Sequence, residues 1–384
     1  MTTTTYDTIV IGAGAMGSAT CYQLARRGQR VLGLEQFDIP HSRGSSHGYT
    51  RIIRMAYFEH PSYVPLLRRS YELWAALEAE AGEQLFYKTG GLDIGPPGSH
   101  VFEGSLRSCQ QHDLPHVVFS GAQVTTRYPA YQLPADYQAV YQPNAGFLLP
   151  ERSIVAFVEG TFRHGGEIHA REAVLGWEPV GDGVRVTTDR AVYEAGSLVL
   201  TAGAWSGRAL PWLAELAVPE RQVLAWLQPA APALFTPDRF PVFILDQGDE
   251  YFYGFPVFDV PGFKFGWYHH RRETGEPEAL IDQGPDAVDE AALRAFAARF
   301  FPQGNGPTMA LRTCMFTNSP DEHFIIGLHP ELPQVSLAAG FSGHGFKFAS
   351  VVGEIMADLA VERTTQHDIE LFRVDRFGNS QREA

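Results

Sequence analysis

The sequence predicts an α/β fold in which a Rossmann-like nucleotide-binding domain is joined to a second, sheet-rich α+β domain. A glycine loop, Gly12-x-Gly14-x-x-Gly17, directly follows a short apolar run near the N-terminus. Such a loop between a strand and a helix is typical of dinucleotide binding. A second glycine turn, Gly343-His344-Gly345, follows another apolar run roughly 330 residues later. Two such turns at opposite ends of the chain predict one large cofactor that is held at two places.

The length and composition limit the classes of protein to which this chain can belong. At 384 residues it is long enough for two domains. A net charge of −14 argues against a nucleic-acid partner. No apolar stretch reaches the roughly 18 residues that a membrane helix needs, so we expect no membrane partner. Residues 1–7 show neither a basic region nor a cleavage site, so we expect no secretory signal. The three cysteines are too few and too scattered for a disulfide framework, and we therefore expect a cytoplasmic protein.

The first 35 residues predict a complete β-α-β unit. The β-branched run at residues 8–11 suits a buried parallel strand, and residues 15–27 predict a helix that ends at Gly28. Residues 31–34 predict the next strand, which ends at Glu35. An acid about 20 residues beyond such glycines binds a ribose hydroxyl group. The unit as a whole therefore predicts dinucleotide binding.

An arginine-rich segment follows at residues 42–54. Its small polar residues, Ser45 and Ser46, suit a close approach of the backbone to a ligand. Arg51 and Arg54 stand three residues apart, so a helical turn would point both side chains the same way. The alternative interpretation is an ordinary basic turn in solvent.

The rest of the chain shows alternating helical and strand-like patterns. Helices are predicted at residues 61–81, 152–164, 290–301 and 346–360, the last of them amphipathic. Strands are predicted at 184–188, 198–200, 251–255, 324–327 and 335–340, and residues 86–150 are predicted to be strand-like pieces that alternate with loops. Strand 198–200 runs into a small-residue turn at Ala202 and Gly203, which we expect to lie near the cofactor.

These patterns predict two domains, each assembled from separate segments. We expect the nucleotide-binding domain to comprise residues 1–80, 151–220 and 320–384. We expect the substrate domain to comprise residues 81–150 and 221–319.

Lysine is scarce in this chain, with 27 arginines but only three lysines, Lys88, Lys264 and Lys347. A GC-rich or heat-adapted source would explain the bias, and so would positions that need a compact ammonium group. Lys347 follows the second glycine turn, where a helix N-terminus and an ammonium group would together stabilise a negatively charged ligand. Lys264 lies between two phenylalanines, and it is either a buried functional cation or an edge-strand lysine.

One cysteine and four histidines are the other candidates for chemistry. A single cysteine in an apolar strand, such as Cys314, is usually a small buried hydrophobe. The adjacent His269 and His270 would point to opposite faces of a strand, so we expect no metal site. His47 and His344 have glycine neighbours and are expected to bond to the cofactor or the backbone.

With these residues in place, the chain resembles the monomeric sarcosine oxidase family of flavoenzymes, which includes N-methyltryptophan and pipecolate oxidases. The resemblance extends from Tyr6 to about Phe377. The motifs that carry it are Ser45-Ser46-His47-Gly48 with Thr50-Arg51-Ile52-Ile53-Arg54, Tyr253-Gly254-Phe255-Pro256, Cys314-Met315 with Asp321-Glu322, and Gly343-His344-Gly345-Phe346-Lys347. It implies a glutathione-reductase-like fold of the FAD oxidoreductase type.

The resemblance implies roles for individual side chains. FAD would be joined to Cys314 through a thioether, and Arg54 and Lys347 would bind the substrate carboxylate. Arg51 would lie near the flavin, Lys264 would activate oxygen, and Tyr253 would line the substrate pocket. The residues expected to contact FAD, besides Gly12, Gly14, Gly17 and Glu35, are Ser45, Ser46, His47, Arg51, Ile52, Val174, Ala202, Gly203, Met315, Gly343, Gly345, Phe346 and Lys347.

Three positions depart from the family pattern. Tyr49 stands where the family usually has Asp, and Phe316 replaces a tyrosine of sarcosine oxidase. The histidine expected four residues after the oxygen-site lysine is Tyr268 here, and His269 follows it, so either residue could occupy the pocket. Residues 34–37 and 40–44 look especially like pipecolate oxidase.

The resemblance implies a monomeric, FAD-dependent oxidase of secondary amino acids that uses oxygen. Sarcosine as substrate would give glycine, formaldehyde and hydrogen peroxide. The alternatives are an oxidase of L-pipecolate or another cyclic imino acid, a flavin dehydrogenase with a different electron acceptor, and a flavin-binding structural subunit. The second glycine turn disfavours a nicotinamide dehydrogenase.

Overall fold

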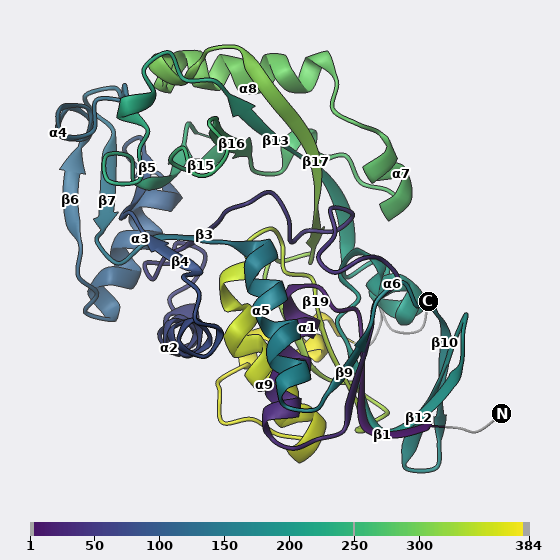
Figure 1. The fold of residues 1–384 in the computed structure, drawn as a ribbon. Coiled ribbons are helices and arrows are strands. Elements are labelled where there is room, and N and C mark those ends of the chain that lie inside the picture. Colours follow the sequence, from purple (N-terminus) through teal and green to yellow (C-terminus); the bar gives the residue numbers. More distant parts are fainter. Residues whose placement is uncertain (1–3, 249, 379–384) are drawn as a thin grey trace.

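The computed structural model describes residues 4–248 and 250–378, and within them three β-sheets are flanked by helices (Figure 1). The first sheet has eight strands in the order β10-β11-β12-β1-β2-β9, with β19 beside β12 and β18 beside β19. Its strands are β1 (Thr4–Ile11), β2 (Val31–Leu34), β9 (Glu167–His169), β10 (Val174–Val180), β11 (Gly183–Thr188), β12 (Val192–Leu200), β18 (Ile325–Leu328) and β19 (Val335–Ala339). It confirms the strands predicted at 8–11, 31–34 and 198–200 and in the late segments.

The centre of the first sheet is parallel, as a β-α-β unit requires. Strand β1 pairs in parallel with β2 and β12, and β12 also pairs in parallel with β19. Helix α1 (Ala15–Arg26) connects β1 to β2 and is followed by Gly28, whose φ of 76° suits a residue just past a helix end. The predicted unit at residues 8–35 is therefore confirmed.

Helix α1 packs between two helices that come from distant parts of the chain, α5 (Pro150–Arg163) and α9 (Ala349–Glu362) (Figure 1). A Cβ atom on Gly353 would lie 2.6 Å from the backbone carbon of Ala19, so the two helix backbones approach closely. The expectation that helix α9 is amphipathic is wrong, because 11 of its 14 residues are buried. Helix α9 is covered by α1, by α2 (Tyr63–Ala81) and by strands of the first sheet.

The second sheet also has eight strands, in the order β17-β13-β16-β15-β14-β5-β7-β6. Their bounds are β5 (Gly91–Gly95), β6 (Val117–Ser120), β7 (Gln138–Gln142), β13 (Val218–Leu227), β14 (Val242–Asp246), β15 (Tyr251–Gly254), β16 (Phe263–Trp267) and β17 (Thr308–Asn318). Helix α8 (Ala287–Phe300) lies against one face of this sheet (Figure 1). There the rings of Phe252 and Phe296 stack at a centroid distance of 3.8 Å. This aromatic packing forms the core of the second sheet.

A small third sheet connects the two large ones and corrects one expectation. It consists of β3 (Arg51–Ile53), β8 (Gly146–Leu148) and β4 (Phe86–Lys88). The helical turn expected at Arg51 and Arg54 is therefore wrong, because β3 pairs with β8 along Arg51–Ile53.

Segment 86–150 also contains two helices that the sequence pattern does not reveal, α3 (His100–Gln111) and α4 (Gly121–Arg127). Both begin at a serine cap, because the side chains of Ser99 and Ser120 accept backbone N–H bonds. The remaining short helices include α6 (Ser206–Ala209), α7 (Pro277–Asp282) and the 3-10 turns η1 (Gly203–Trp205), η4 (His270–Arg272) and η6 (Phe346–Phe348).

Strands of the first sheet come from three separate stretches, within residues 4–34, 167–200 and 325–339. Strands of the second come from 91–142 and 218–318. The two-domain division stated above stays a proposal, and its residues 1–3, 249 and 379–384 lie outside the described part of the chain. Among the helices described, none combines the length and apolar character needed to cross a bilayer.

Candidate active site

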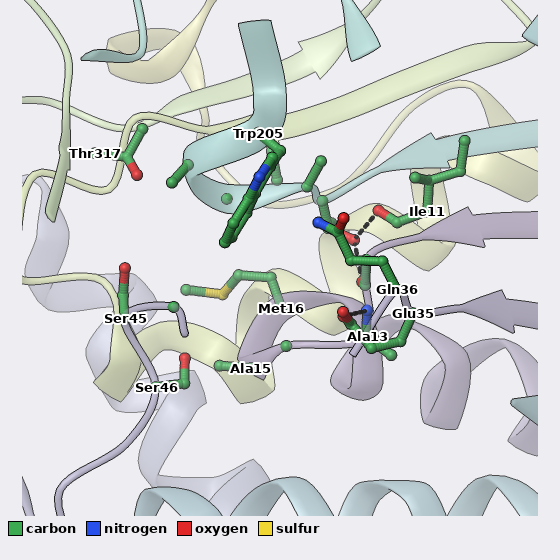
Figure 2. A pocket seen from close by; sticks show the side chains of 18 of the residues that line it. Ile11, Ala13, Ala15, Met16, Glu35, Gln36, Ser45, Ser46, Trp205 and Thr317 are labelled. Carbon is green, nitrogen blue, oxygen red and sulfur yellow. Dashed lines mark hydrogen bonds between the residues drawn. The ribbon is translucent and has the colours of Figure 1, made fainter. Parts of the chain in front are cut away.

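Two cavities share part of their walls. The larger has a volume of about 490 Å³ and lies beyond the carboxyl ends of β1, β2, β12 and β19, the usual ligand position in a parallel sheet. The predicted cofactor residues that line it are Gly12, Gly14, Glu35, Ser45, Ser46, Arg51, Val174, Ala202, Gly203, Met315, Gly343, Gly345 and Phe346. Figure 2 shows Glu35 beside Ala13 in this cavity and Ser45 and Ser46 on the other side of Met16.

Each of the three N-terminal glycines has a different structural reason to lack a side chain. Gly12 has a φ of 92°, and a Cβ atom there would lie 2.6 Å from the Thr201 carbonyl oxygen. Gly17 packs so closely that its Cβ atom would lie 1.7 Å from the Gly12 carbonyl oxygen. A Cβ atom on Gly14 would meet no protein atom within 4 Å, so this glycine leaves open space at the start of α1 for a ligand to approach.

Glu35 closes the β-α-β unit at the end of β2. Its carboxylate accepts hydrogen bonds from the backbone N–H groups of Ala13 and Phe37, each at 3.0 Å. These bonds fix the carboxylate against the glycine loop (Figure 2).

The second glycine turn contributes the opposite wall. Gly343 has a φ of 76°, and a Cβ atom there would lie 2.4 Å from the Phe316 ring. The turn leads into η6 and then α9, so a helical segment does follow the glycines, as predicted, although its first turn is a 3-10 turn.

The smaller cavity has a volume of about 70 Å³ and shares Arg51, Gly343 and Phe346 with the larger one. It brings together five of the residues predicted to bind or process the substrate, and it adds several that were not predicted. The predicted ones are Arg51, Arg54, Tyr253, Tyr268 and Lys347, and the others include Phe58, Glu59, Ile244, Tyr251 and Phe255.

Arg54 is 2% exposed and is held by a buried acid. Its Nη2 atom donates to both carboxylate oxygens of Glu59, at 2.9 and 2.8 Å, and its Nη1 atom donates to the Ala56 carbonyl oxygen. Burial would lower the pKa of Arg54, but the carboxylates of Glu59 and Asp93 raise it above its usual range. Arg54 therefore stays charged inside the protein.

Lys347 is the second buried cation of the smaller cavity. Its Nζ atom donates to the His344 carbonyl oxygen at 2.7 Å and lies 3.5 Å from the Tyr57 hydroxyl group. Burial, with repulsion from Arg54, lowers the pKa of Lys347 to about 7. Two cations beside one small cavity can bind a carboxylate.

The choice between Tyr268 and His269 is resolved by their positions. Tyr268 lines the smaller cavity, stacks on Tyr251 at 4.5 Å, and donates a hydrogen bond from its hydroxyl group to the Ser342 carbonyl oxygen. His269 lines neither cavity, because the chain turns there with a φ of 56° and the ring is held by Glu220 at 2.9 Å. The proposed pocket role of His269 is therefore not supported by its position.

His269 also corrects the expectation that the two adjacent histidines lie on a strand. Strand β16 ends at Trp267, and His270 begins the turn η4. Burial lowers the pKa of His269, but the carboxylates of Glu220 and Glu322 outweigh it and raise the pKa to about 9.

The other two departures from the family pattern lie outside the smaller cavity. Tyr49 is 49% exposed and lines neither cavity, and Phe316 lines the larger one. Only Tyr268 of the three therefore contacts the smaller cavity.

Lys264 is 3% exposed and lines neither cavity, but it lies close to Arg51. Its Nζ atom donates to the carbonyl and hydroxyl oxygens of Thr50, at 2.7 and 3.0 Å, and lies 4.2 Å from the ring centre of Phe255. Burial and repulsion from Arg51 lower its pKa well below the usual range. It is a buried lysine and not an edge-strand lysine.

Cys314 lies on β17 at the border of the larger cavity. Its sulfur atom is 3.6 Å from Nη2 of Arg51 and 4.0 Å from the Ser45 carbonyl oxygen, and both of these residues line that cavity. His47 is buried nearby, and burial with repulsion from Arg51 lowers its pKa to about 3. Gly17 and His47 line neither cavity, and Ile52 lines the smaller one.

The groups that line the larger cavity suit the parts of FAD. The hydroxyl oxygen of Thr317 is buried on its wall with no hydrogen-bond partner among the described residues. The open space over Gly14 and the N-terminus of α1 suit a pyrophosphate, and the Glu35 carboxylate at the end of β2 suits a ribose.

Two buried or partly buried acids beside Arg54 escape the sequence-based prediction, Glu59 and Asp93. Asp93 could have been noticed, because it is an acid within the apolar, glycine-bounded run Gly91–Gly95. Glu59 carries no such signal, since it lies in the irregular segment between β3 and α2.

Comparison with known proteins agrees with this arrangement. The model of the family DAO, "FAD dependent oxidoreductase", matches residues 7–359. A monomeric sarcosine oxidase from Streptomyces avermitilis is 44% identical over 96% of this chain and 97% of the relative. An N-methyl-L-tryptophan oxidase from Yersinia pestis is 36% identical over 97% of this chain and 99% of the relative. The structure of NikD, an amino acid oxidase essential for nikkomycin biosynthesis, is 27% identical with a TM-score of 0.82 and covers 97% of this chain and 98% of its own.

Proposed function

Because the chain belongs to the DAO family of FAD-dependent oxidoreductases, we propose that it is an oxidase of small secondary amino acids. The observation that carries the proposal is the smaller cavity, where the buried cations Arg54 and Lys347 face a space that adjoins the larger cavity. The two cations bind the carboxylate and leave the amine near the shared wall formed by Arg51, Gly343 and Phe346.

FAD would be held by the residues that line the larger cavity, and Cys314 would attach it through a thioether. The chemistry that FAD supplies when bound is to accept a hydride equivalent from the carbon next to the amine nitrogen. The residues of this chain bind and orient the substrate, and the aromatic wall of Phe58, Tyr251, Tyr253 and Tyr268 keeps water away from it.

The products that we propose are an imine, which water hydrolyses, and hydrogen peroxide. For sarcosine, hydrolysis of the imine gives glycine and formaldehyde. Lys264 favours oxygen as the acceptor, because its buried amine beside Arg51 takes up a proton when a neighbouring molecule gains negative charge. The protein is proposed to act as a monomer, as the name of its Streptomyces relative indicates for that protein.

The aromatic wall favours one second candidate, a cyclic secondary amino acid such as L-pipecolate. The stacked rings of Tyr251 and Tyr268, with the ring of Phe58 5.7 Å from Tyr251, offer an apolar surface to a saturated ring. The same wall leaves little room for an indole side chain in a cavity of about 70 Å³.

The proposal is tested by mixing the flavin-loaded protein anaerobically with sarcosine, L-pipecolate, N-methyl-L-tryptophan or glycine and recording the visible absorbance of the oxidised flavin. We expect bleaching by sarcosine or L-pipecolate and none by N-methyl-L-tryptophan or glycine. Admission of air should then consume oxygen and form peroxide. Bleaching without oxygen uptake would favour a dehydrogenase, and no bleaching by any secondary amino acid would refute the proposal.

A further inference from the structure

Asp93 is a carboxylate buried behind the smaller cavity. It is 1% exposed and lies on β5, between β14 and β7 of the second sheet. Its Oδ2 atom accepts hydrogen bonds from Ser105 Oγ at 2.7 Å and from Gln142 Nε2 at 2.9 Å. Its Oδ1 atom lies 3.9 Å from Nε of Arg54, a buried donor that has no hydrogen-bond partner among the described residues. Asp93 is therefore fixed in place and faces the cation that lines the cavity.

The two buried cations Arg54 and Lys347 already have two buried carboxylates beside them, Glu59 and Asp93. Arg51, the third cation of the lining, is held by the carbonyl oxygens of Thr50 and Ser45 at the wall shared with the larger cavity. A substrate carboxylate between Arg54 and Lys347 therefore competes with Glu59 and Asp93 for these two cations, and it binds more weakly while both acids are ionised.

Asp93 is the acid that can take up a proton. Burial raises the pKa of Asp93 to about 6, against the opposing effects of Arg54 and Ser105. Burial would also raise the pKa of Glu59, but its two hydrogen bonds to Arg54 and the charge of Arg54 hold that pKa below the usual range. Glu59 therefore stays ionised at a pH at which Asp93 is protonated.

The other titratable groups near Asp93 do not replace it in this role. Cys109 on α3 has a pKa raised to about 12 by burial and by Asp93, so it stays a neutral thiol. Asp246 on β14 accepts a hydrogen bond from Ser99 at 2.6 Å and is not among the charges that act on Asp93. Lys347, whose pKa is lowered to about 7, also changes charge near neutral pH.

Building on the function proposed above, we propose that Asp93 is a positioning residue that acts through Arg54 and couples the binding of the substrate carboxylate to a proton. When Asp93 is protonated, Arg54 and Lys347 have a net positive charge to offer, and the carboxylate binds tightly. When Asp93 is ionised, it competes for the charge of Arg54, and binding weakens.

The sign of the pH effect follows from this coupling. The Kd of an anionic ligand is low below pH about 6 and rises as the pH increases, because Asp93 ionises. Loss of the Lys347 charge near pH 7 acts in the same direction. The pH profile of the natural protein alone cannot separate the two groups, but a variant that removes only Asp93 can.

The experiment compares two unreactive probes of the same shape, methoxyacetate and methoxyacetamide, in the flavin-loaded protein between pH 5.5 and 8.5. Binding is followed by the change in visible flavin absorbance and by calorimetry. We expect Asp93→Asn to bind methoxyacetate about tenfold more tightly than the natural protein at pH 8.5, and equally below pH about 6. Methoxyacetamide, which carries no charge, should bind equally to both at every pH.

Two further variants keep the test decisive. Asp246→Asn removes another buried acid of the same sheet and should leave both Kd profiles unchanged. Ser105→Ala removes a hydrogen bond that stabilises the ionised Asp93, so the rise in Kd should move to higher pH. This shift tests the proposal even if Asp93→Asn fails to fold.

Two results would overturn the inference. One is an unchanged Kd for methoxyacetate in Asp93→Asn at pH 8.5, and the other is an equal tightening of methoxyacetamide, which would indicate altered packing. In both cases the proposed function would stand if secondary amino acids reduce the flavin. If neither probe binds and no secondary amino acid reduces the flavin, the proposed function falls together with the inference.

Discussion

At the scale of single residues, Lys264 is a buried amine whose pKa is lowered well below the usual range by burial and by Arg51. Its Nζ atom donates hydrogen bonds to the two oxygens of Thr50. We predict that Lys264→Met slows reoxidation of the reduced protein by oxygen about 100-fold, because it removes the group that takes up a proton as oxygen gains negative charge. Stopped-flow measurement of the two half-reactions should show reduction by substrate nearly unchanged.

The control for this change is Lys88→Met, which removes an exposed lysine that donates a hydrogen bond to Asn144. It should leave both half-reactions as they are. Equal slowing of reduction and reoxidation in Lys264→Met would show that the lysine has a structural role and not a role towards oxygen.

Cys314 is the residue that we propose to attach the flavin. Its sulfur lies within 4.0 Å of two groups on the wall of the larger cavity. We predict that acid precipitation leaves the flavin on the natural protein and releases it from Cys314→Ala. Cys109→Ala, which removes a buried thiol on α3, should retain its flavin. Release of flavin from the natural protein would rule out the thioether.

The sequence predicts residues of the site best where the chemistry is local. Gly12, Gly14 and Glu35 belong to one short unit, so their positions follow from the chain itself. Glu59 and Asp93 were missed, because their meeting with Arg54 depends on how the second sheet is ordered. The sequence leaves Tyr268 and His269 open as alternatives for the pocket, because it does not reveal that the strand ends at Trp267 and that the turn at His269 directs this side chain away from the cavity.

At the scale of elements, the contact between β1 and α1 depends on two glycines with opposite surroundings. A Cβ atom on Gly17 would clash with the Gly12 carbonyl oxygen, whereas one on Gly14 would meet no protein atom within 4 Å. We predict that Gly17→Ala lowers the free energy of unfolding by about 1 to 3 kcal/mol. We predict that Gly14→Ala leaves it within about 0.5 kcal/mol but lowers the flavin content.

Urea unfolding followed by circular dichroism, with the ratio of visible to ultraviolet absorbance, separates these two effects. The two glycines lie three residues apart, so each variant serves as the control for the other. A loss of stability in Gly14→Ala as large as that in Gly17→Ala would contradict the proposal that the space over Gly14 belongs to the ligand.

Most helices and strands with a strong hydrophobic periodicity are predicted correctly, and the elements that are predicted wrongly have physical reasons. The pattern at residues 61–81 and 152–164 predicts α2 and α5 within two residues at each end. Helix α3 was missed, because Gly104 and two serines weaken its helical pattern. Packing requires the glycine, since a Cβ atom on Gly104 would lie 2.5 Å from the Phe58 carbonyl oxygen. Helix α9 was misjudged, since partners from distant segments surround it.

At the scale of the whole molecule, an ion pair fastens the last long helix to the rest of the protein. Glu354 on α9 accepts hydrogen bonds from Arg69 on α2 at 2.6 and 2.9 Å and lies 3.0 Å from Nε2 of His367. Burial would raise the pKa of Glu354, but these partners lower it to about 2. The carboxylate therefore stabilises the fold above pH about 4.5, and this stabilisation is lost as the pH falls towards 2.

We predict that Glu354→Gln lowers the free energy of unfolding by about 1 to 2 kcal/mol at pH 7, and that the difference shrinks below pH about 4.5. Urea unfolding at pH 7, 5 and 3.5 measures it. The control is Glu72→Gln, which breaks only an exposed pair with Arg69 and should change stability by less than about 0.5 kcal/mol. A difference that is constant with pH would contradict the assigned pKa.

The arrangement of the whole chain is the least predictable level from one sequence. The glycine turns indicate that residues near 12 and near 343 approach one cofactor, and both line the larger cavity. The order of strands in the second sheet does not follow from periodicity, because β5 pairs with β14 across some 150 residues of sequence. For that reason the domain division remains a proposal.

The position of the second glycine turn has a consequence for how the protein is made. The wall formed by Gly340, Gly343 and Phe346 faces the N-terminal glycine loop across the larger cavity, and α9 packs on α1. While a ribosome is still synthesising the first 300 residues, this wall does not yet exist, and the early loop has nothing opposite it. We therefore expect the complete cofactor site to form only after residues 340–346 have been synthesised and have folded against the early loop.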